Sequence, residues 1–202
     1  MRNVTLYGMT GSGNSMKPKW VAERTGWQVS WNEIDVFKGE TRTPAFLALN
    51  PAGQVPVAVF ADGRTLAQSN AIMLFLAQGS DLIPDDVFAR AKMFEWLFWE
   101  QYSHEPTIAV RIARKYYLGE KEDALDPALL TKGNAALARM ELALSGNRFL
   151  VGEALSLADI ALVAYTRVAH WGGFDLGSYP GVAGWVDRVE TALGLDSGAA
   201  AA

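Results

Sequence analysis

The fold is decided by residues 50–78, NPAGQVPVAVFADGRTLAQSNAIMLFLAQ. A strand-like run at 57–60 is followed by Asp62-Gly63, a strong hairpin signal, and by a short strand at 65–67. A helix is predicted from Ser69 to Gln78, with the next glycine as its stop. An antiparallel hairpin that runs into a helix predicts a sheet covered by helices.

The residues before this stretch supply the rest of the sheet. Apolar residues alternate with polar ones at 27–31, but the next apolar residues, Ile34 and Val36, fall on the opposite parity. We therefore expect a bulge or a late strand start near Asn32. The order β-α-β-α-β-β-α within about eighty residues predicts a mixed sheet. The predicted elements are strands at 4–7 and 27–31 and helices at 15–25 and 43–49.

The character of the sequence changes after Pro84. No strand pattern follows, and helical spacing runs through 88–118, 127–144, 156–170 and 182–193. Ser156 and Asp159 stand three apart before an apolar run, the spacing of a capping box with Asp in place of Glu. We therefore predict an α/β domain at 1–79, a linker at 80–85 and an all-helical domain at 86–202.

Composition excludes several classes of site. The 202 residues carry a net charge of −4 and no cluster of Lys or Arg, which argues against nucleic-acid binding. The absence of cysteine excludes a protein thiol nucleophile, and two histidines far apart in sequence make a metal site unexpected. Without a signal-like start or a long apolar run, no membrane association is predicted, and we expect a cytoplasmic protein.

Small residues fill the loop Tyr7–Ser15, YGMTGSGNS, between the first strand and the first helix. Such a loop places backbone N–H groups and a hydroxyl at a helix N-terminus, which suits an anion. The alternative is a flexible turn in which Ser12, Asn14 or Ser15 caps the helix. A hydroxyl can do both, so the two interpretations are compatible.

Two later positions also suit a ligand. A cis Val55-Pro56 bond would turn the Val55 backbone outward, toward a peptide-like molecule, whereas a trans proline at an edge strand is the ordinary alternative. The hydroxyl of Ser69 and the first N–H groups of its helix suit a carboxylate; a simple serine N-cap is the alternative.

Together these segments resemble the glutathione S-transferase family over residues 4 to about 190. TLYGMTGSGNSMK resembles the first strand and active-site loop of the family, and NPAGQVPVAV its cis-proline segment. LAQSNAIMLFLA resembles the γ-glutamyl site, and FLVGEALSLADIALVAYT the signature of the helical domain. The resemblance implies a thioredoxin-like N-terminal domain followed by a helical bundle domain.

The resemblance also implies roles for individual residues. Ser12 matches the hydroxyl that bonds the glutathione sulfur in serine-type members, and Asn14 ranks second among Thr10, Ser12, Asn14 and Ser15 for that contact. Gln68 stands where Glu is more usual, which weakens the expected grip on the substrate amine. The implied peptide-binding set is Gln54 at the glycyl end, Val55 and Pro56 beside the backbone, and Gln68 and Ser69 at the γ-glutamyl group.

The stretch 93–117 also resembles bacterial members, in which this helix lines a hydrophobic substrate pocket. Phe98, Tyr102 and His104 are the candidates, and a purely structural core stripe is the alternative for the aromatic residues. The implied enzyme stabilises glutathione thiolate for attack on a small hydrophobic electrophile, without a metal, as a homodimer. The rivals are a glutathione-dependent disulfide reductase or peroxidase, and a non-catalytic glutathione-binding interaction module.

Overall fold

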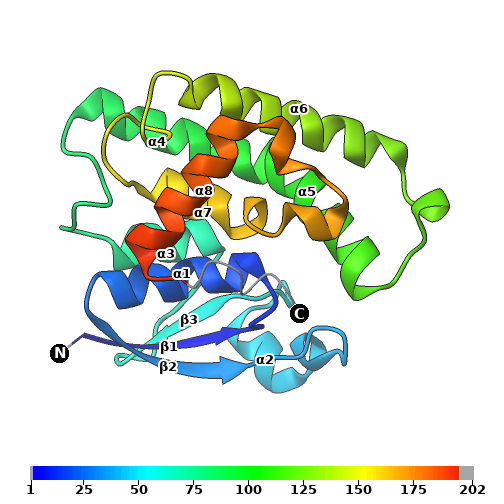
Figure 1. Ribbon diagram of the computed structural model, residues 1–202. Coiled ribbons are helices and arrows are strands. Elements are labelled where there is room, and N and C mark those ends of the chain that lie inside the picture. Colours follow the sequence, from blue (N-terminus) through cyan, green and yellow to red (C-terminus); the bar gives the residue numbers. More distant parts are fainter. Residues whose placement is uncertain (1, 196–202) are drawn as a thin grey trace. The chain divides into compact units, whose positions relative to one another are not determined.

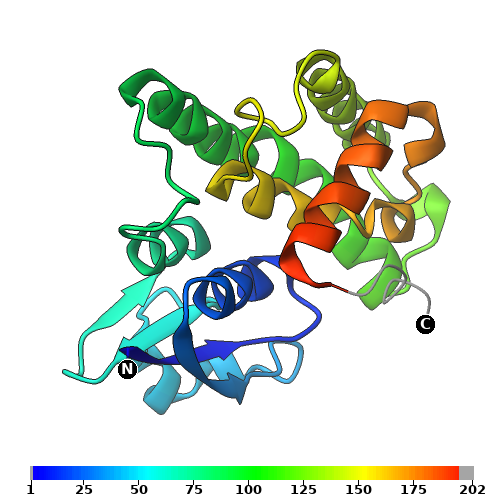
Figure 2. The same cartoon turned by 60° about the vertical axis from the view of Figure 1, so that its left-hand side comes forward.

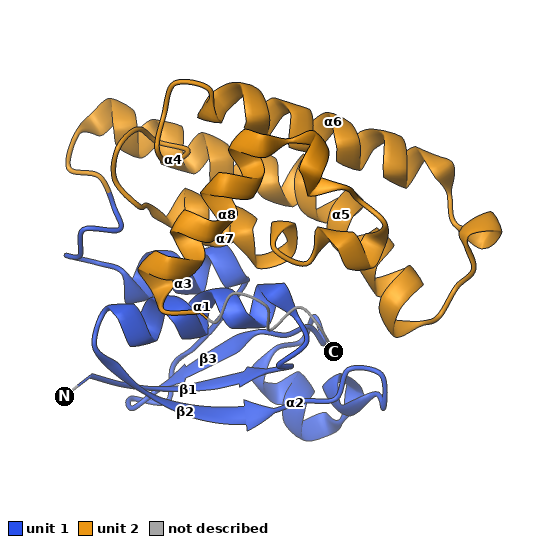
Figure 3. Ribbon diagram, viewed as in Figure 1, with its two compact units in different colours: residues 1–83 blue, residues 84–202 orange. Residues whose placement is uncertain are grey.

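The computed structural model describes residues 2–195 and divides into two compact units, residues 1–83 and 84–202 (Figure 3). The sequence from 197 to 202 is of low complexity, and we assign it no function; it lies outside the described residues. Unit 1 contains β1 (Arg2–Gly8), α1 (Gly13–Arg24), β2 (Trp27–Glu33), α2 (Pro44–Leu49), β3 (Val57–Phe60), β4 (Thr65–Ala67) and α3 (Ser69–Leu76). The predicted β-α-β-α-β-β-α order is confirmed.

The four strands form one mixed sheet in the order β2-β1-β3-β4. β1 pairs parallel with β2 and antiparallel with β3, and β4 closes the predicted hairpin. Helices α1 and α3 lie on one face of this sheet and α2 on the other (Figures 1 and 2). The sheet therefore brings the C-terminal end of β1 close to the segment that precedes β3.

The irregularity expected near Asn32 is absent. β2 pairs with β1 without interruption from Trp27 to Glu33, and Ile34 then donates its backbone N–H to Gly8 O at 2.8 Å. The change of apolar parity arises because the strand ends at Glu33. Ile34 and Val36 belong to the following connection and not to a shifted strand.

Unit 2 is helical, with no named strand among residues 84–195. Its first helical run is continuous from 87 to 117 but contains two π-helical turns, at Glu100–His104 and Ala113–Tyr117. Such turns widen a helix by one residue and are frequent at functional positions. The α-helices of unit 2 are α4 (Val87–Trp99) and α5 (Glu105–Ile112) within that run, then α6 (Pro127–Leu144), α7 (Leu157–Thr166) and α8 (Pro180–Leu193).

Asp159 organises the centre of unit 2. Its carboxylate accepts hydrogen bonds from the backbone N–H and hydroxyl of Ser156, from Leu150 N at 2.8 Å and from the Trp185 indole at 2.9 Å. The predicted capping box is thereby confirmed. Burial raises the pKa of Asp159, although these four donors act in the opposite direction. One acidic side chain thus ties α7 to α8 and to the loop before α7.

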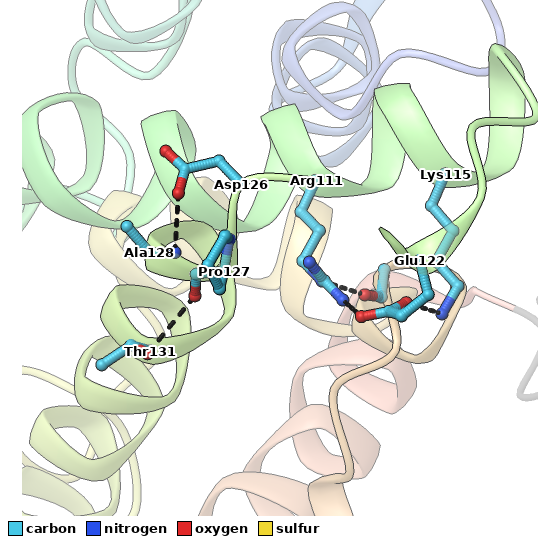
Figure 4. Close-up of polar contacts among 8 residues, drawn as sticks. Arg111, Lys115, Glu122, Asp126, Pro127, Ala128 and Thr131 are labelled. Atoms are coloured by element: carbon cyan, nitrogen blue, oxygen red, sulfur yellow. Dashed lines mark hydrogen bonds and ion pairs between the residues drawn. The ribbon is translucent and has the colours of Figure 1, made fainter. Parts of the chain in front are cut away.

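A second buried charge fixes the connection between α5 and α6 (Figure 4). Arg111 is 1% exposed and donates from Nε to Gly172 O at 2.7 Å, and its guanidinium also pairs with Glu122. Lys115 reaches the same carboxylate at 2.9 Å. Hydrogen bonds from Lys115 and Arg111 hold the pKa of Glu122 below its ordinary value. The sequence before α6 is therefore anchored although it has little regular structure.

Among residues 2–195, no helix is both long and apolar enough to cross a membrane.

Candidate functional site

The candidate site loop, residues 9–12, turns directly from β1 into α1. Ser12 is the N-cap of α1, and its hydroxyl accepts from Ser15 N at 3.4 Å. The cap interpretation is therefore confirmed, but a bond this long lies beyond the usual range for N–H···O. The Ser12 hydroxyl is half-buried and keeps its capacity to donate to an anion at the positive end of the helix.

Thr10 is held by a residue that sequence reasoning missed. The Glu33 carboxylate accepts from Thr10 N at 2.8 Å, from the Thr10 hydroxyl at 2.7 Å and from the Trp31 indole at 2.6 Å. Partial desolvation works to raise the pKa of Glu33, but these hydrogen bonds keep it below its ordinary value. The Thr10 hydroxyl is thus already engaged, which weakens its candidacy for contact with sulfur.

Ser15 is fully buried below the loop. Its hydroxyl accepts from Met9 N at 3.2 Å, and its side chain packs against the backbone of Gly8. A side chain at position 8 would meet Trp31 and Ser15 at less than 3 Å, so this close packing requires glycine. The buried Ser15 side chain therefore supports the loop. This placement leaves Ser12 and Asn14 as the stronger candidates for contact with the glutathione sulfur.

Asn14 connects the first and third helices. Its Oδ1 accepts from Lys17 Nζ at 2.8 Å and from the Ser69 hydroxyl at 3.2 Å. Ser69 is the first residue of α3 and not its N-cap, a position that Gln68 occupies. The hydrogen bond therefore brings the N-terminal turns of α1 and α3 together, although 55 residues separate Asn14 from Ser69.

Gln68 has an unusual backbone conformation. It is the only non-glycine among the described residues with positive φ, at φ 71° and ψ 114°. A conformation of this kind costs on the order of 1–3 kcal/mol and is found mainly where a site requires it. The side chain of Gln68 is exposed beside the start of α3. A strained residue next to a helix N-terminus marks this position as a candidate ligand contact.

The segment before β3 is held by hydrogen bonds to a buried side chain. The buried Asn50 donates from Nδ2 to Gln54 O at 2.8 Å and accepts from Ala52 N at 3.1 Å. The Val55-Pro56 peptide bond is cis, as the ligand-binding interpretation requires. Gln54 is exposed and Val55 half-buried, whereas Pro56 is buried at the start of the hairpin.

Arg42 lies against the same segment. Its Nη1 is 3.4 Å from Ala52 O, and a Cβ on Gly53 would meet that nitrogen at less than 3 Å. Gly53 also has φ +62°, so both space and conformation require glycine there. The exposed guanidinium places a cation beside Ala52 and Gly53, just before Gln54 in the chain, another feature absent from the sequence predictions.

Comparison with known proteins agrees with this geometry. Residues 2–78 match the family profile described as "Glutathione S-transferase, N-terminal domain", and residues 92–192 match "Glutathione S-transferase, C-terminal domain". The chain belongs to the glutathione S-transferase family. Glutathione S-transferase theta-1 of Mus musculus is 34% identical over 182 residues, which cover 81% of this chain and 72% of the relative.

Solved bacterial glutathione S-transferases are more similar. The enzyme from Pseudomonas fluorescens Pf-5 is 45% identical with a TM-score of 0.90, and the match covers 93% of this chain and 94% of that one. The protein from Xanthobacter autotrophicus Py2 is also 45% identical, with a TM-score of 0.88 and coverage of 93% and 92%. The predicted fold, a thioredoxin-like domain followed by a helical domain, is confirmed.

The three residues that the resemblance assigns to the substrate pocket differ in their exposure. Phe98 and Tyr102 are 72% and 87% exposed, so the core interpretation is wrong for both. His104 is 0% exposed, and its Nε2 lies 2.9 Å from the Thr166 hydroxyl. This burial places His104 inside the helical unit, and we leave it out of the proposed substrate pocket.

A cavity of about 550 Å³ opens beside Tyr102 within unit 2. The cavity lies between the π-helical turn that carries Tyr102 and helix α6, and Trp99 forms part of its wall. Arg139 lies over the Trp99 ring at 4.5 Å from the centroid, so one wall is aromatic and cationic. The cavity is lined by Trp99, Tyr102, Ser103, Pro106, Thr107, Asp126, Ala128, Leu129, Lys132, Ala135, Ala136 and Arg139.

No group of three acidic or histidine side chains suited to a metal ion occurs within residues 2–195. The candidate site in unit 1 is instead built from hydroxyls, amides and helix N-termini. These are groups that bind a peptide with anionic ends.

Proposed function

We propose that this protein is a glutathione transferase. Unit 1 binds glutathione and favours its thiolate, and the thiolate attacks a small hydrophobic electrophile. The observation that carries this proposal is the hydrogen bond between Asn14 and Ser69, at 3.2 Å. It joins two helix N-termini, each suited to an anion, and glutathione carries in one molecule a thiolate for the first and a γ-glutamyl carboxylate for the second.

The sulfur subsite is assigned to Ser12, with Asn14 as the second donor. A free thiol has a pKa near 8.5, so only a few per cent is thiolate at neutral pH. A hydroxyl donor at the N-terminus of α1 favours the charged form, and each tenfold increase in thiolate corresponds to about 1.4 kcal/mol. With no cysteine in the chain, glutathione is the only thiol in the proposed reaction.

The other proposed contacts are made with the γ-glutamyl, cysteinyl and glycyl parts of glutathione in turn. Gln68 and Ser69 hold the γ-glutamyl amine and carboxylate at the start of α3. Val55, fixed by Pro56, pairs antiparallel with the cysteinyl backbone. Gln54 and the Arg42 guanidinium, which lies against Ala52 and Gly53, meet the glycyl carboxylate, for which a planar cation is a suitable partner.

The chemistry needs no redox partner. The thiolate sulfur donates an electron pair to an electrophilic carbon, a carbon–sulfur bond forms, and the leaving group departs with its own pair. The thiol proton leaves to solvent when glutathione binds. The contribution of the protein is to position the sulfur and stabilise its charge.

We propose that the hydrophobic second substrate binds at the exposed side chains of Phe98 and Tyr102. Both rings offer apolar area, and Tyr102 adds a hydroxyl at its tip. We also propose that the protein acts as a homodimer, as expected for this family.

Calorimetric titration with reduced glutathione, combined with ultraviolet difference spectra, tests the proposal. Binding in the micromolar to millimolar range with a thiolate signal is expected. Ser12→Ala should reduce the thiolate signal while keeping most of the affinity, and Ser69→Ala should reduce affinity. Binding without thiolate would favour a non-catalytic glutathione-binding module, and no binding by the folded protein would overturn the proposal.

A disulfide reductase is the second candidate, favoured by the position of Asn14 in the network. Bound glutathione thiolate would attack a disulfide and release one thiolate, and a second glutathione would then displace the other to give oxidised glutathione. A larger activity loss in Asn14→Ala than in Ser12→Ala, with a disulfide substrate, would support this chemistry over conjugation.

A further inference from the structure

Lys17 is a charged residue that the proposed function leaves unused. It lies one turn after Asn14 on α1, and its side chain is 0% exposed. Burying an ammonium group is costly unless good acceptors surround it. On a helix surface, lysine would remain in water at little cost, so its burial at this position indicates a specific task.

The contact between Lys17 and Asn14 fixes the orientation of an amide. An ammonium group can only donate, so the Asn14 atom that meets Lys17 Nζ at 2.8 Å must be the carbonyl oxygen. The Ser69 hydroxyl reaches the same oxygen at 3.2 Å. With both lone-pair directions of Oδ1 engaged, any further partner of Asn14 meets its amide N–H group, which is a donor suited to an anion.

We propose that Lys17 is a positioning residue of the glutathione site: its buried ammonium orients the Asn14 amide so that a donor faces the sulfur, and couples the sulfur subsite to Ser69. This role rests on the proposed function, because it concerns the same ligand. Lys17 does not touch the sulfur itself. It acts through Asn14, and its effect should vanish when Asn14 is absent.

The test compares Lys17→Met with Lys17→Arg, and uses Lys19→Met as the matched control. Lys19 lies on the same helix, but it is partly exposed and pairs with Glu23 at 2.6 Å. Two quantities are measured for each protein. The first is the thiolate fraction of bound glutathione at neutral pH, from ultraviolet difference spectra. The second is the affinity for S-hexylglutathione, which has no thiol and reports the peptide contacts alone.

Lys17→Met should lower the thiolate fraction roughly three- to tenfold, a change equivalent to half to one pKa unit of the thiol. Affinity for S-hexylglutathione should change by less than about twofold, and Lys17→Arg should restore most of the thiolate. An unchanged thiolate fraction in Lys17→Met would overturn the role of Lys17. Equal loss of both ligands would also overturn it, because that result indicates general damage to the fold.

A double-mutant cycle isolates the route through Asn14. In an Asn14→Ala background, Lys17→Met should have no further effect on thiolate, whereas an additive loss would contradict the coupling. If Lys17→Met does not fold, Lys17→Arg must keep the thiolate within about twofold of the parent and Asn14→Ala must lower it; any other result overturns the proposal. No glutathione binding by the unmodified protein would instead overturn the proposed function.

Discussion

At the scale of single residues, the site depends on a few positions with unusual constraints. Gln68 has positive φ, Gly53 has no room for a side chain beside Arg42, and Gly8 has none beside Ser15. Each constraint serves the loop or helix end that would meet glutathione. The positive φ of Gln68 is costly for stability, and strain of this kind is found mainly where a site requires it.

Replacing Gln68 separates strain from ligand contact. Gln68→Gly should stabilise the unliganded protein by about 1 kcal/mol or less, because glycine adopts this backbone freely. Gln68→Ala keeps the strain and should give no such gain. Both should weaken glutathione binding, since both lack the amide. Thermal unfolding and calorimetric titration measure the two effects, and unchanged affinity in both variants would remove Gln68 from the site.

At the scale of elements, the candidate site loop before α1 is held by hydrogen bonds to the end of β2. Two of the three hydrogen bonds that Glu33 accepts come from Thr10 and tie this strand end to the loop, two residues before the Ser12 cap of α1. The loop is thereby positioned by a neighbouring strand as well as by its own residues Ser12 and Ser15. Its geometry should depend on the charge of one carboxylate.

Glu33→Gln should therefore raise the KM for glutathione several-fold. Because the pKa of Glu33 is lowered in the folded protein, its contribution to stability is present above its ordinary value of 4.5. It is lost as pH falls through the lowered folded value. The stability difference between the parent and Glu33→Gln, from urea unfolding, should shrink in that acidic range. Exposed Glu153→Gln is the control, and a pH-independent difference would refute the electrostatic role.

The π-helical turn after α4 presents Tyr102 beside the cavity of unit 2. Tyr102→Ala should raise the KM for a hydrophobic electrophile about fivefold, which corresponds to about 1 kcal/mol of lost contact, and leave the KM for glutathione unchanged. Phe88→Ala, an exposed aromatic at the start of α4, is the control. If sedimentation instead shows a weakened dimer with unchanged KM, this face is a subunit interface.

At the scale of the whole molecule, each unit has its own organising centre. The hydrogen bond between Asn14 of α1 and Ser69 of α3 joins two helix N-termini of the candidate site in unit 1, whereas the Asp159 carboxylate joins three segments of unit 2. The absence of cysteine is also a property of the entire chain. Both facts lead to predictions about the protein as a whole.

Asp159→Ala should destabilise the protein by roughly 3–5 kcal/mol, because it leaves buried donors of Ser156, Leu150 and Trp185 without their acceptor. Asp187→Ala, an exposed acid on α8, should change stability by less than about 0.5 kcal/mol. Chemical denaturation of both variants measures the difference. A small effect at Asp159 would mean that this network can rearrange without loss.

Treatment of the unliganded protein with a thiol-alkylating reagent, followed by its removal, should leave transferase activity unchanged. The chain offers no cysteine to modify, and the proposed nucleophile arrives with glutathione. Activity with and without the treatment is the measurement. Inactivation would show that another side chain reacts and is needed for activity.

Local sequence patterns were sufficient to predict much of the secondary structure of this protein. The hairpin at Asp62-Gly63, the capping box at Ser156 and the order of elements were predicted because turn chemistry and hydrophobic period act over a few residues. The bulge near Asn32 was wrong, since parity alone cannot show where a strand ends. The motifs around Ser12, Pro56 and Ser69 also indicated the family before any geometry was known.

The sequence by itself determined the two-part fold, the family and the exclusion of a protein thiol. Only the tertiary structure decided that Glu33 engages Thr10, that Lys17 and Ser69 share Asn14, and that His104 is buried while Tyr102 is exposed. The reason is physical: hydrogen bonds between residues as distant as Asn14 and Ser69, 55 positions apart, and the burial of one helix face depend on how elements pack. No local pattern of residues contains that information.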